Sequence, residues 1–399
     1  MINKFNNVEF LVGKNFNLKF KCLDIYNEKV LNFISDLANL LAKKKETKNF
    51  PDVRTFAFFC RKNNLKNFKK KYSNKSLRLG LGIVFHITPS NIPTNFAYSL
   101  VFGLITGNLN IIKVPSKKFD QVKIITKAIN ELLLLKKYFF LRDMITIVRY
   151  SQNDQLTTEL SSACDARILW GGDQTINQLR KFPIKERAID IPFADRYSIC
   201  LLNSNKIVNL NNQGLKSLVE KFYNDTFAVD QNACSSPQII FWTKTESIKA
   251  KEIFWKNLSN YISKKYKPPE ISSIDNYNNL CSNFLENDNL IKSYKIFNKS
   301  IYTISLKKLN NQITNLRGKW GFFYEFEIND INKISDFINK KFQTATYFGF
   351  DKKHFLNFMK KNKLSGIDRF VPVGQALDID LIWDGYDLNK ILSREVVVR

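Results

Sequence analysis

Cys234 is the residue of this sequence whose surroundings best suit nucleophilic chemistry. It lies in the segment Asp230–Pro237, which reads Asp-Gln-Asn-Ala-Cys-Ser-Ser-Pro. Small neighbours leave room for a substrate, and backbone N–H groups beside the cysteine can stabilise both a thiolate and an oxyanion. A cysteine is more often an inert buried thiol, so this segment alone leaves the two interpretations open.

A second candidate is Asn91, which stands between Pro89 and Pro93. The two prolines restrict the backbone around the asparagine, as an amide donor to a developing oxyanion requires. An ordinary capped turn before a helix explains the same residues equally well.

The remaining cysteines and the histidines argue against metal chemistry. The six cysteines, at 22, 60, 164, 200, 234 and 281, form no CxxC pair, and the only histidines are His86 and His354. We therefore expect no metal site, and reduced thiols suit a cytoplasmic protein. His86 is either a proton shuttle or a packed strand residue, and His354 is predicted on a helix surface.

The formal net charge of +26 would suit a nucleic-acid-binding protein. However, the basic residues are scattered in short runs, and no finger, zipper or aromatic RNA-binding signature is present. We interpret the charge as a lysine-rich surface that also attracts anionic substrates. Nucleic-acid binding is kept as a remote alternative.

Residues 79–112 contain no Asp, Glu, Lys or Arg. Pro89, Pro93 and several asparagines divide this stretch into pieces too short to span a membrane. We predict a buried strand, loop, helix and strand here, at 82–87, 88–93, 95–106 and 111–114. Residues 1–21 lack the apolar centre of a signal peptide, so no membrane span and a cytoplasmic location are expected.

Strands and helices alternate from residue 81 onwards, which predicts an α/β fold with parallel strands. Ligands in such sheets bind beyond the carboxyl ends of the strands, where the loops 88–93 and 171–173 are expected. A second α/β region follows, with a helix at 215–223, a strand at 238–242 and a helix at 248–266. The segment 267–300, rich in Asn and Ser, is predicted to form loops.

Several motifs in series resemble the acyl-CoA reductase family of the bacterial bioluminescence type, a branch of the aldehyde dehydrogenase superfamily. They occur in consistent order over roughly residues 80–399. The matching segments are 82–100, Gly107-Asn108 with Ile112-Lys113, Trp170-Gly171-Gly172-Asp173, Gln231–Pro237, and the C-terminal pieces 366–369, 374–378 and 383–388.

The resemblance implies an aldehyde dehydrogenase-like fold with a Rossmann-type cofactor domain. We expect residues 1–200 to form the N-terminal region and cofactor domain and 201–365 the catalytic domain. Residues 366–399 are expected to pack back on the body.

The resemblance also implies a role for each matching residue. Cys234 corresponds to the catalytic cysteine, and Asn91 to the asparagine whose amide forms the oxyanion hole with the cysteine's backbone N–H. Lys113 corresponds to the lysine that reaches the adenosine ribose. The other implied cofactor-binding residues are Thr88, Pro89 and Ser90 along the cofactor, and Gly171 and Gly172 on its pyrophosphate side.

Two departures from the superfamily pattern bear on the reaction. Phe193 occupies the position of the glutamate that activates water in hydrolysing dehydrogenases, so an acyl-enzyme would be protected from hydrolysis. The acidic residue that often follows the cofactor lysine is missing, which favours NADPH over NADH while leaving NADH possible. Asp195 is a carboxylate close in sequence to Phe193, but it is expected to form a structural ion pair with Arg196.

The resemblance thus implies reduction of an acyl thioester, on coenzyme A or a carrier, to an aldehyde through an acyl-enzyme on Cys234. It also suggests an acyl-activating ligase or transferase as a partner, and a homo-oligomer. An aldehyde-oxidising or acyl-phosphate-reducing enzyme of the same superfamily is the alternative. Acyl chain length, acyl donor and pathway stay open.

Overall fold

The computed structural model describes residues 8–16, 18–19, 21–72, 76–151 and 153–399. The chain forms two compact units. The first comprises the described residues up to Ala194 together with Leu381–Arg399, and the second comprises Asp195–Asp380.

The first unit is built on a six-stranded sheet with the spatial order β1-β5-β4-β3-β6-β7. All neighbouring strands are parallel except β1, which is antiparallel to β5. The chain runs outward from β3 in both directions, so the topological switch point lies between β3 and β6. The strands are β1 (Glu9–Val12), β3 (Ile83–Ile87), β4 (Leu109–Val114), β5 (Ile145–Arg149), β6 (Ala166–Trp170) and β7 (Ile189–Phe193).

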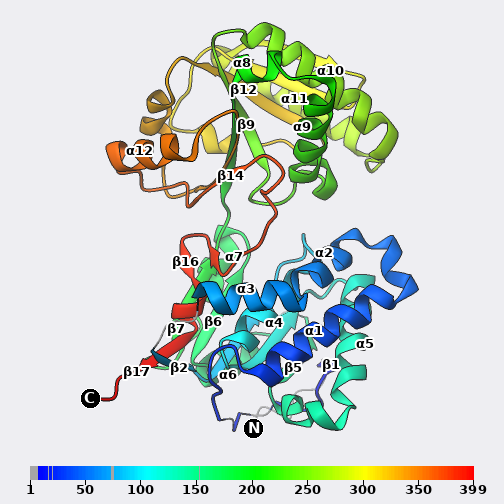
Figure 1. Cartoon of the computed structure of the whole chain (residues 1–399), viewed down its shortest axis with the longest axis vertical. Coiled ribbons are helices and arrows are strands. Elements are labelled where there is room, and N and C mark those ends of the chain that lie inside the picture. Colours follow the sequence, from blue (N-terminus) through cyan, green and yellow to red (C-terminus); the bar gives the residue numbers. More distant parts are fainter. Residues whose placement is uncertain (1–7, 17, 20, 73–75, 152) are drawn as a thin grey trace. The chain divides into compact units, whose positions relative to one another are not determined.

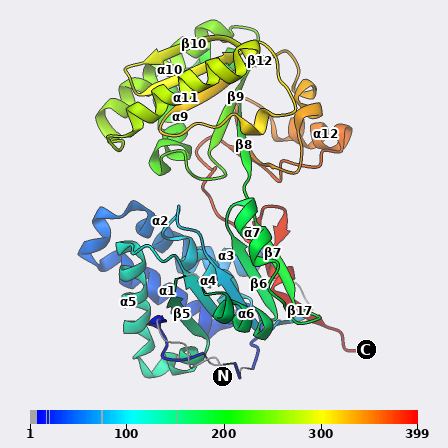
Figure 2. The same cartoon turned by 180° about the vertical axis from the view of Figure 1, so that it is seen from behind.

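Helices cover both faces of this sheet. Figure 1 shows α1 (Glu28–Lys43), α3 (Lys62–Tyr72) and α4 (Asn95–Ile105) in front of it. Figure 2 shows α6 (Asp154–Ala163) and α7 (Asp173–Leu179) on the opposite face. Leu156 and Leu160 of α6 pack there in one apolar cluster with Phe85 and Ile111 of the strands. The remaining helices are α2 (Pro51–Phe59) and α5 (Asp120–Leu133).

The uncharged stretch 79–112 is buried, as the sequence predicts. All five residues of β3 and all eleven residues of α4 are buried. The prediction of a strand, loop, helix and strand is confirmed within a few residues at each end. No helix in the described part of the chain is both long enough and apolar enough to cross a membrane.

The C-terminal segment pairs with the early part of the chain in the first unit. Strand β17 (Ser393–Val396) is antiparallel to β2 (Leu77–Gly80), and β15 (Ile382–Trp383) pairs with β16 (Tyr386–Asp387). Arg78 secures this contact because its buried guanidinium donates to the backbone oxygens of Lys390 and Ser393.

The second unit contains a seven-stranded sheet with the order β10-β11-β12-β9-β8-β13-β14, parallel except for β10. Helices α9 (Asn212–Asp225) and α10 (Ser247–Lys265) lie on one side of β9 and β12, and α12 (Lys352–Asn362) lies on the other (Figure 1). The strands are β8 (Tyr197–Leu202), β9 (Pro237–Thr243), β10 (Ile291–Phe297), β11 (Ile301–Leu306), β12 (Phe322–Ile328), β13 (Phe342–Phe348) and β14 (Arg369–Pro372).

The prediction that residues 267–300 form loops is wrong. This segment contains α11 (Ser272–Asn287) and β10. Its asparagines, which suggested loops, instead make tertiary hydrogen bonds: Asn276 donates to the Trp320 carbonyl oxygen, and Asn283 accepts from the Tyr324 hydroxyl. Because these partners lie some forty residues away in sequence, local composition did not reveal the helix.

His86 is a core residue of β3 and is fully buried. Its Nδ1 lies 2.7 Å from Ser99 Oγ, and its Nε2 lies 3.0 Å from Asn110 Oδ1. Since the Asn110 oxygen only accepts, Nε2 carries the proton and Nδ1 accepts from Ser99. Burial lowers the pKa of His86 to about 4, although the bond to Asn110 opposes this shift. The geometry therefore favours the packed, neutral histidine over the proton shuttle.

This burial predicts a pH dependence of stability. Between pH 6.5 and about 4 the unfolded chain binds a proton at His86 that the folded chain does not, so stability falls as the pH is lowered. The contribution amounts to about 3 kcal/mol over that range. Urea unfolding between pH 4.5 and 7 is expected to show a shallower pH dependence in His86→Gln, whereas the exposed control His354→Gln keeps the original slope. Identical slopes in both variants would contradict the assignment.

Candidate active site

Cys234 lies in a turn at the amino end of β9, in the second unit. The turn begins with Asp230 and Gln231, which have φ angles of 53° and 58°. Two consecutive non-glycine residues in the left-handed region are sterically unfavourable, and the surrounding structure must hold them there. Cys234 itself is half-buried.

The side chain of Gln231 fixes this turn to the start of β12. It is buried, and its amide donates to the carbonyl oxygens of Pro237 and Phe322 at 3.2 and 3.0 Å. Its Oε1 accepts from the backbone N–H of Gly321 at 3.2 Å. These three bonds hold the backbone leading to Cys234 in one conformation. Gln231 stands in the motif quoted for the cysteine, but its role was not predicted.

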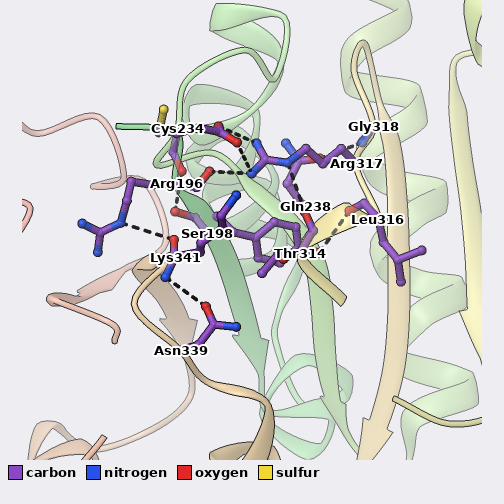
Figure 3. Close-up of polar contacts among 12 residues, drawn as sticks. Arg196, Ser198, Cys234, Gln238, Thr314, Leu316, Arg317, Gly318, Asn339 and Lys341 are labelled. Atoms are coloured by element: carbon purple, nitrogen blue, oxygen red, sulfur yellow. Dashed lines mark hydrogen bonds and ion pairs between the residues drawn. The ribbon is translucent and has the colours of Figure 1, made fainter. Parts of the chain in front are cut away.

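Ser198 of β8 contacts the cysteine's own backbone (Figure 3). Its hydroxyl donates to the Cys234 carbonyl oxygen at 2.6 Å and accepts from the Thr344 backbone N–H at 3.2 Å. Ser198 is fully buried, and its bond to the Thr344 N–H is buried as well. Ser198 is a polar residue within the largely apolar strand 197–202, and this feature of the sequence could have indicated the contact.

Replacing Ser198 tests whether this contact positions the cysteine. Ser198→Ala removes the bond to the Cys234 carbonyl oxygen and takes away the hydroxyl to which the buried Thr344 N–H donates, which costs about 2 kcal/mol of stability. Ser204→Ala is the matched control, because that buried hydroxyl donates to the Thr243 carbonyl oxygen at the other end of the sheet. Urea unfolding is expected to show similar losses in both variants, while the rate of Cys234 acylation falls roughly tenfold only in Ser198→Ala. Equal rates in the two variants would contradict the positioning role.

Asp195 is held by an ion pair, but its partner is not the one predicted. Arg317 donates to Asp195 Oδ1 at 3.0 Å. It also donates to the Arg196 carbonyl oxygen at 3.1 Å (Figure 3). Arg196 instead pairs with Asp368. Adjacent residues of a nearly extended chain point in different directions, so Asp195 and Arg196 each find a partner distant in sequence.

Asp225, at the end of α9, is a buried acid that sequence reasoning missed. Its carboxylate accepts from the backbone N–H groups of Gly374 and Ala376 at 2.6 and 2.9 Å. Burial raises the pKa of Asp225 to about 7, against the lowering effect of those two bonds. Its carbonyl oxygen also accepts from the Ser236 hydroxyl at 2.7 Å. Asp225 therefore joins the segment 374–376 to the turn that carries Cys234.

The other predicted residues lie in the first unit, at the carboxyl ends of β3, β4 and β6. Thr88 directly follows β3, and both its N–H and its hydroxyl donate to the Lys113 carbonyl oxygen, at 3.1 and 3.0 Å. Gly171 and Gly172 follow β6, the strand beside β3. The topology thus gathers the predicted cofactor residues at the switch point of the sheet, where ligands of α/β proteins bind.

The loop after β3 presents its polar groups outward. Ser90 and Asn91 are exposed, and Pro89 is half-buried. Within the described part of the chain the Asn91 amide has no hydrogen-bond partner, which leaves it available to a ligand. The buried Oδ1 of Asn95, at the start of α4, also lacks a partner among the described residues.

Lys113 and Gly172 have surroundings that leave them available to a ligand. Burial lowers the pKa of Lys113, whose ammonium lies 5.0 Å from the centroid of the Tyr150 ring and pairs with no carboxylate of the described residues. A Cβ added at Gly172 would meet no atom within 4 Å. The protein's own packing thus does not require this glycine, and the space beside it is open.

Comparison with known proteins identifies the family. A model of the family described as acyl-CoA reductase (LuxC) matches residues 3–394. The chain belongs to this family. The resemblance inferred from the sequence motifs is therefore confirmed.

A curated member related to this chain is a long-chain acyl-protein thioester reductase of Aliivibrio fischeri, 21% identical over 299 residues. The match covers 73% of this chain and 58% of that protein, so the chain spans little more than half the length of its relative.

Solved structures similar to this chain include aldehyde dehydrogenase 21 from Physcomitrella patens, with a TM-score of 0.63, 11% identity and coverage of 94% of this chain and 85% of that one. An NADP-dependent glyceraldehyde-3-phosphate dehydrogenase from Bacillus halodurans gives a TM-score of 0.61, 13% identity and coverage of 92% and 86%. The predicted aldehyde dehydrogenase-like α/β fold is confirmed.

In this member of the LuxC family, Phe193 is the residue predicted to stand in place of the hydrolytic glutamate, and its ring is buried. Phe193, the last residue of β7, stacks on Trp170 with ring centroids 3.9 Å apart and an interplanar angle of 15°. The ring of Tyr386 packs edge-on against Phe193, with the two ring centroids 5.8 Å apart. The Trp170 indole N–H donates to Ser99 Oγ, the same atom that bonds His86. Three aromatic rings thus occupy this part of the first unit.

Proposed function

We propose that this chain reduces an acyl thioester to an aldehyde through an acyl-enzyme on Cys234, with NADPH as the reductant. Membership of the LuxC family, with Cys234 held in a rigid turn, is the observation that carries the proposal. The A. fischeri relative is described as acting on an acyl-protein thioester, which supports a protein-bound acyl donor beside coenzyme A.

In this proposal Cys234 attacks the thioester carbonyl carbon as a thiolate, and the carrier thiol leaves after a tetrahedral oxyanion forms. The Asn91 amide and the Cys234 backbone N–H donate to that oxyanion. Gln231 and Ser198 keep the sulfur and the N–H in place, because they fix the turn on both sides of the cysteine. Phe193 offers no carboxylate to activate water, so the acyl group stays on the sulfur until it is reduced.

The residues of the first unit fit a nicotinamide cofactor. Lys113, partly buried and without a carboxylate partner in the described structure, is suited to bind ribose hydroxyls. Thr88, Pro89 and Ser90 would lie along the cofactor, and the open space beside Gly172 would admit its pyrophosphate. When bound, the cofactor supplies the hydride that turns the acyl-enzyme into a thiohemiacetal, which collapses to aldehyde and free cysteine. Ser116, Lys117 and Lys118 are exposed and include no acid to repel a 2′-phosphate, which supports NADPH.

A panel of labelled acyl-CoAs and acyl-proteins, mixed with the chain in the absence of cofactor, tests this function. Mass spectrometry is expected to find an acyl adduct on the peptide containing Cys234, and NADPH is expected to discharge it as aldehyde. Release of free acid, or turnover of free aldehyde with NADP⁺, would favour an aldehyde-oxidising enzyme and overturn the proposal. NADH run in parallel decides the cofactor.

We also propose a cytoplasmic location, a homo-oligomer and a partner enzyme that supplies the activated acyl group. Co-purification from the source cells, followed by size-exclusion chromatography with light scattering, tests the two assemblies. A monomer without acyl-transferring partners would contradict them.

A further inference from the structure

The second unit has a lysine-lined cavity at the end of its sheet opposite to Cys234. The cavity has a volume of about 460 Å³, which is within the size range of small-molecule sites. It lies at the carboxyl ends of β9, β11 and β12, whereas Cys234 precedes the amino end of β9. Its basic lining residues are Lys244, Lys251, Lys292, Lys307 and Lys333.

The topology explains why a cavity forms there. Strands β9 and β12 are parallel neighbours (Figure 2). After β9 the chain enters α10 on one face of the sheet, and after β12 it enters the 3-10 helix η7 (Ile331–Phe337) on the other face. Connections that leave adjacent parallel strands toward opposite faces create a crevice at the strand ends, the usual ligand position in α/β sheets.

The acidic residues of the cavity are already bound to protein groups. Glu325 is buried, and its Oε1 accepts from the indole N–H groups of Trp242 and Trp255, each at 2.8 Å. Glu327 is paired with Lys251 at 3.0 Å. Both carboxylates therefore have protein partners, and neither needs a cation to satisfy it.

The other four lysines form no such direct pair, although Lys292 attracts the Glu327 carboxylate from a longer distance. Lys244, Lys292, Lys307 and Lys333 are exposed, and none has an ion-pair partner in the ranges that the structure describes. Five lysines against two glutamates leave an excess of three positive charges around one cavity. Phe326 and Leu306 add apolar surface to the lining. Ammonium groups converging from separate elements are the common means of binding phosphate oxygens.

We propose that this cavity binds a small molecule carrying a di- or triphosphate, at a site that shares no residue with the cofactor loops or with the turn that carries Cys234. The excess of three charges matches the charge of such a group, and the volume admits a molecule of nucleotide size. The proposal does not depend on the acyl reduction, because none of the lining residues takes part in it.

ATP and inorganic tripolyphosphate are suitable probes for this site. Lysine acetylation is read out by mass spectrometry at about 0.15 M salt, where nonspecific surface attraction is screened. Both probes are expected to slow acetylation of Lys292, Lys307 and Lys333, and to leave the control lysines of α9 and α10 unprotected. Those controls are Lys216, Lys256 and Lys264, which are exposed in the same unit but do not line the cavity.

Calorimetric titration of two triple variants completes the test. Replacing Lys292, Lys307 and Lys333 together by Gln is expected to weaken tripolyphosphate binding by about 10- to 100-fold. The same change at Lys216, Lys256 and Lys264 is expected to alter it less than about twofold. Equal losses in both variants would show that tripolyphosphate binds through general surface charge, and this would overturn the proposal.

In the acetylation experiment, protection by a polyglutamate peptide but by neither phosphate probe would also overturn the proposal, in favour of an acidic protein partner. Protection by ATP alone would show that the nucleoside is needed as well.

Discussion

Cys234→Ser is expected to lower the rate of aldehyde formation from acyl thioesters at least about 1,000-fold. A serine hydroxyl retains the shape of the thiol but is a far weaker nucleophile at neutral pH in the absence of a neighbouring base. Removal of a nucleophile from an enzyme that works through a covalent intermediate commonly has effects of this size or larger. The measurement is single-turnover aldehyde production with NADPH, together with the mass of the intact chain after exposure to acyl donor.

The control for this experiment is Cys281→Ser, because Cys281 is exposed on α11 and distant in sequence from the turn. Its rate is expected to stay within about twofold of the original chain, since an exposed helix position contributes little to stability. Both variants should unfold at similar urea concentrations. If folded Cys234→Ser produced aldehyde at the original rate, the acyl-enzyme mechanism would be wrong, whatever the outcome at the lysine-lined cavity.

Asn91→Ala is expected to lower the rate of acylation about 100- to 1,000-fold, with little change in the apparent affinity for the thioester. Its amide is proposed to donate only to the oxyanion that develops as the sulfur attacks, and loss of one such donor removes about 3–4 kcal/mol of transition-state stabilisation. Stability should change little, because Asn91 is exposed and its amide has no hydrogen-bond partner in the described part of the molecule.

Asn91→Asp tests whether acylation needs the hydrogen bond that the Asn91 amide donates or only the shape of the side chain. The carboxylate has nearly the size of the amide but cannot donate when ionised, and its charge would repel an oxyanion. We therefore expect a rate at or below that of Asn91→Ala. Asn209→Asp, at an exposed asparagine after α8 (Ser204–Val208), controls for the added charge. Rapid-quench measurement of the Cys234 adduct gives the acylation rate directly. A rate unchanged in both Asn91 variants would remove this residue from the proposed oxyanion hole.

The local pattern of the sequence determined the order and type of most elements. The uncharged run 79–112 predicts β3, α4 and β4 because a strand and helix buried on all sides need no polar face. The order of the motifs around Asn91, Lys113, Gly171 and Cys234 was sufficient to indicate the family. These features depend on residues close together in the chain, so they can be recognised without knowing the fold.

Only the tertiary structure decided which distant groups meet. Arg317 rather than Arg196 pairs with Asp195, Asp225 holds Gly374 and Ala376, and asparagines that suggested loops support α11. The lysines at 244, 292, 307 and 333 form no run in the sequence, yet they surround one cavity. Parallel strands place residues from remote segments at the same edge of a sheet. Their proximity is therefore a property of the strand order, which the local sequence pattern does not contain.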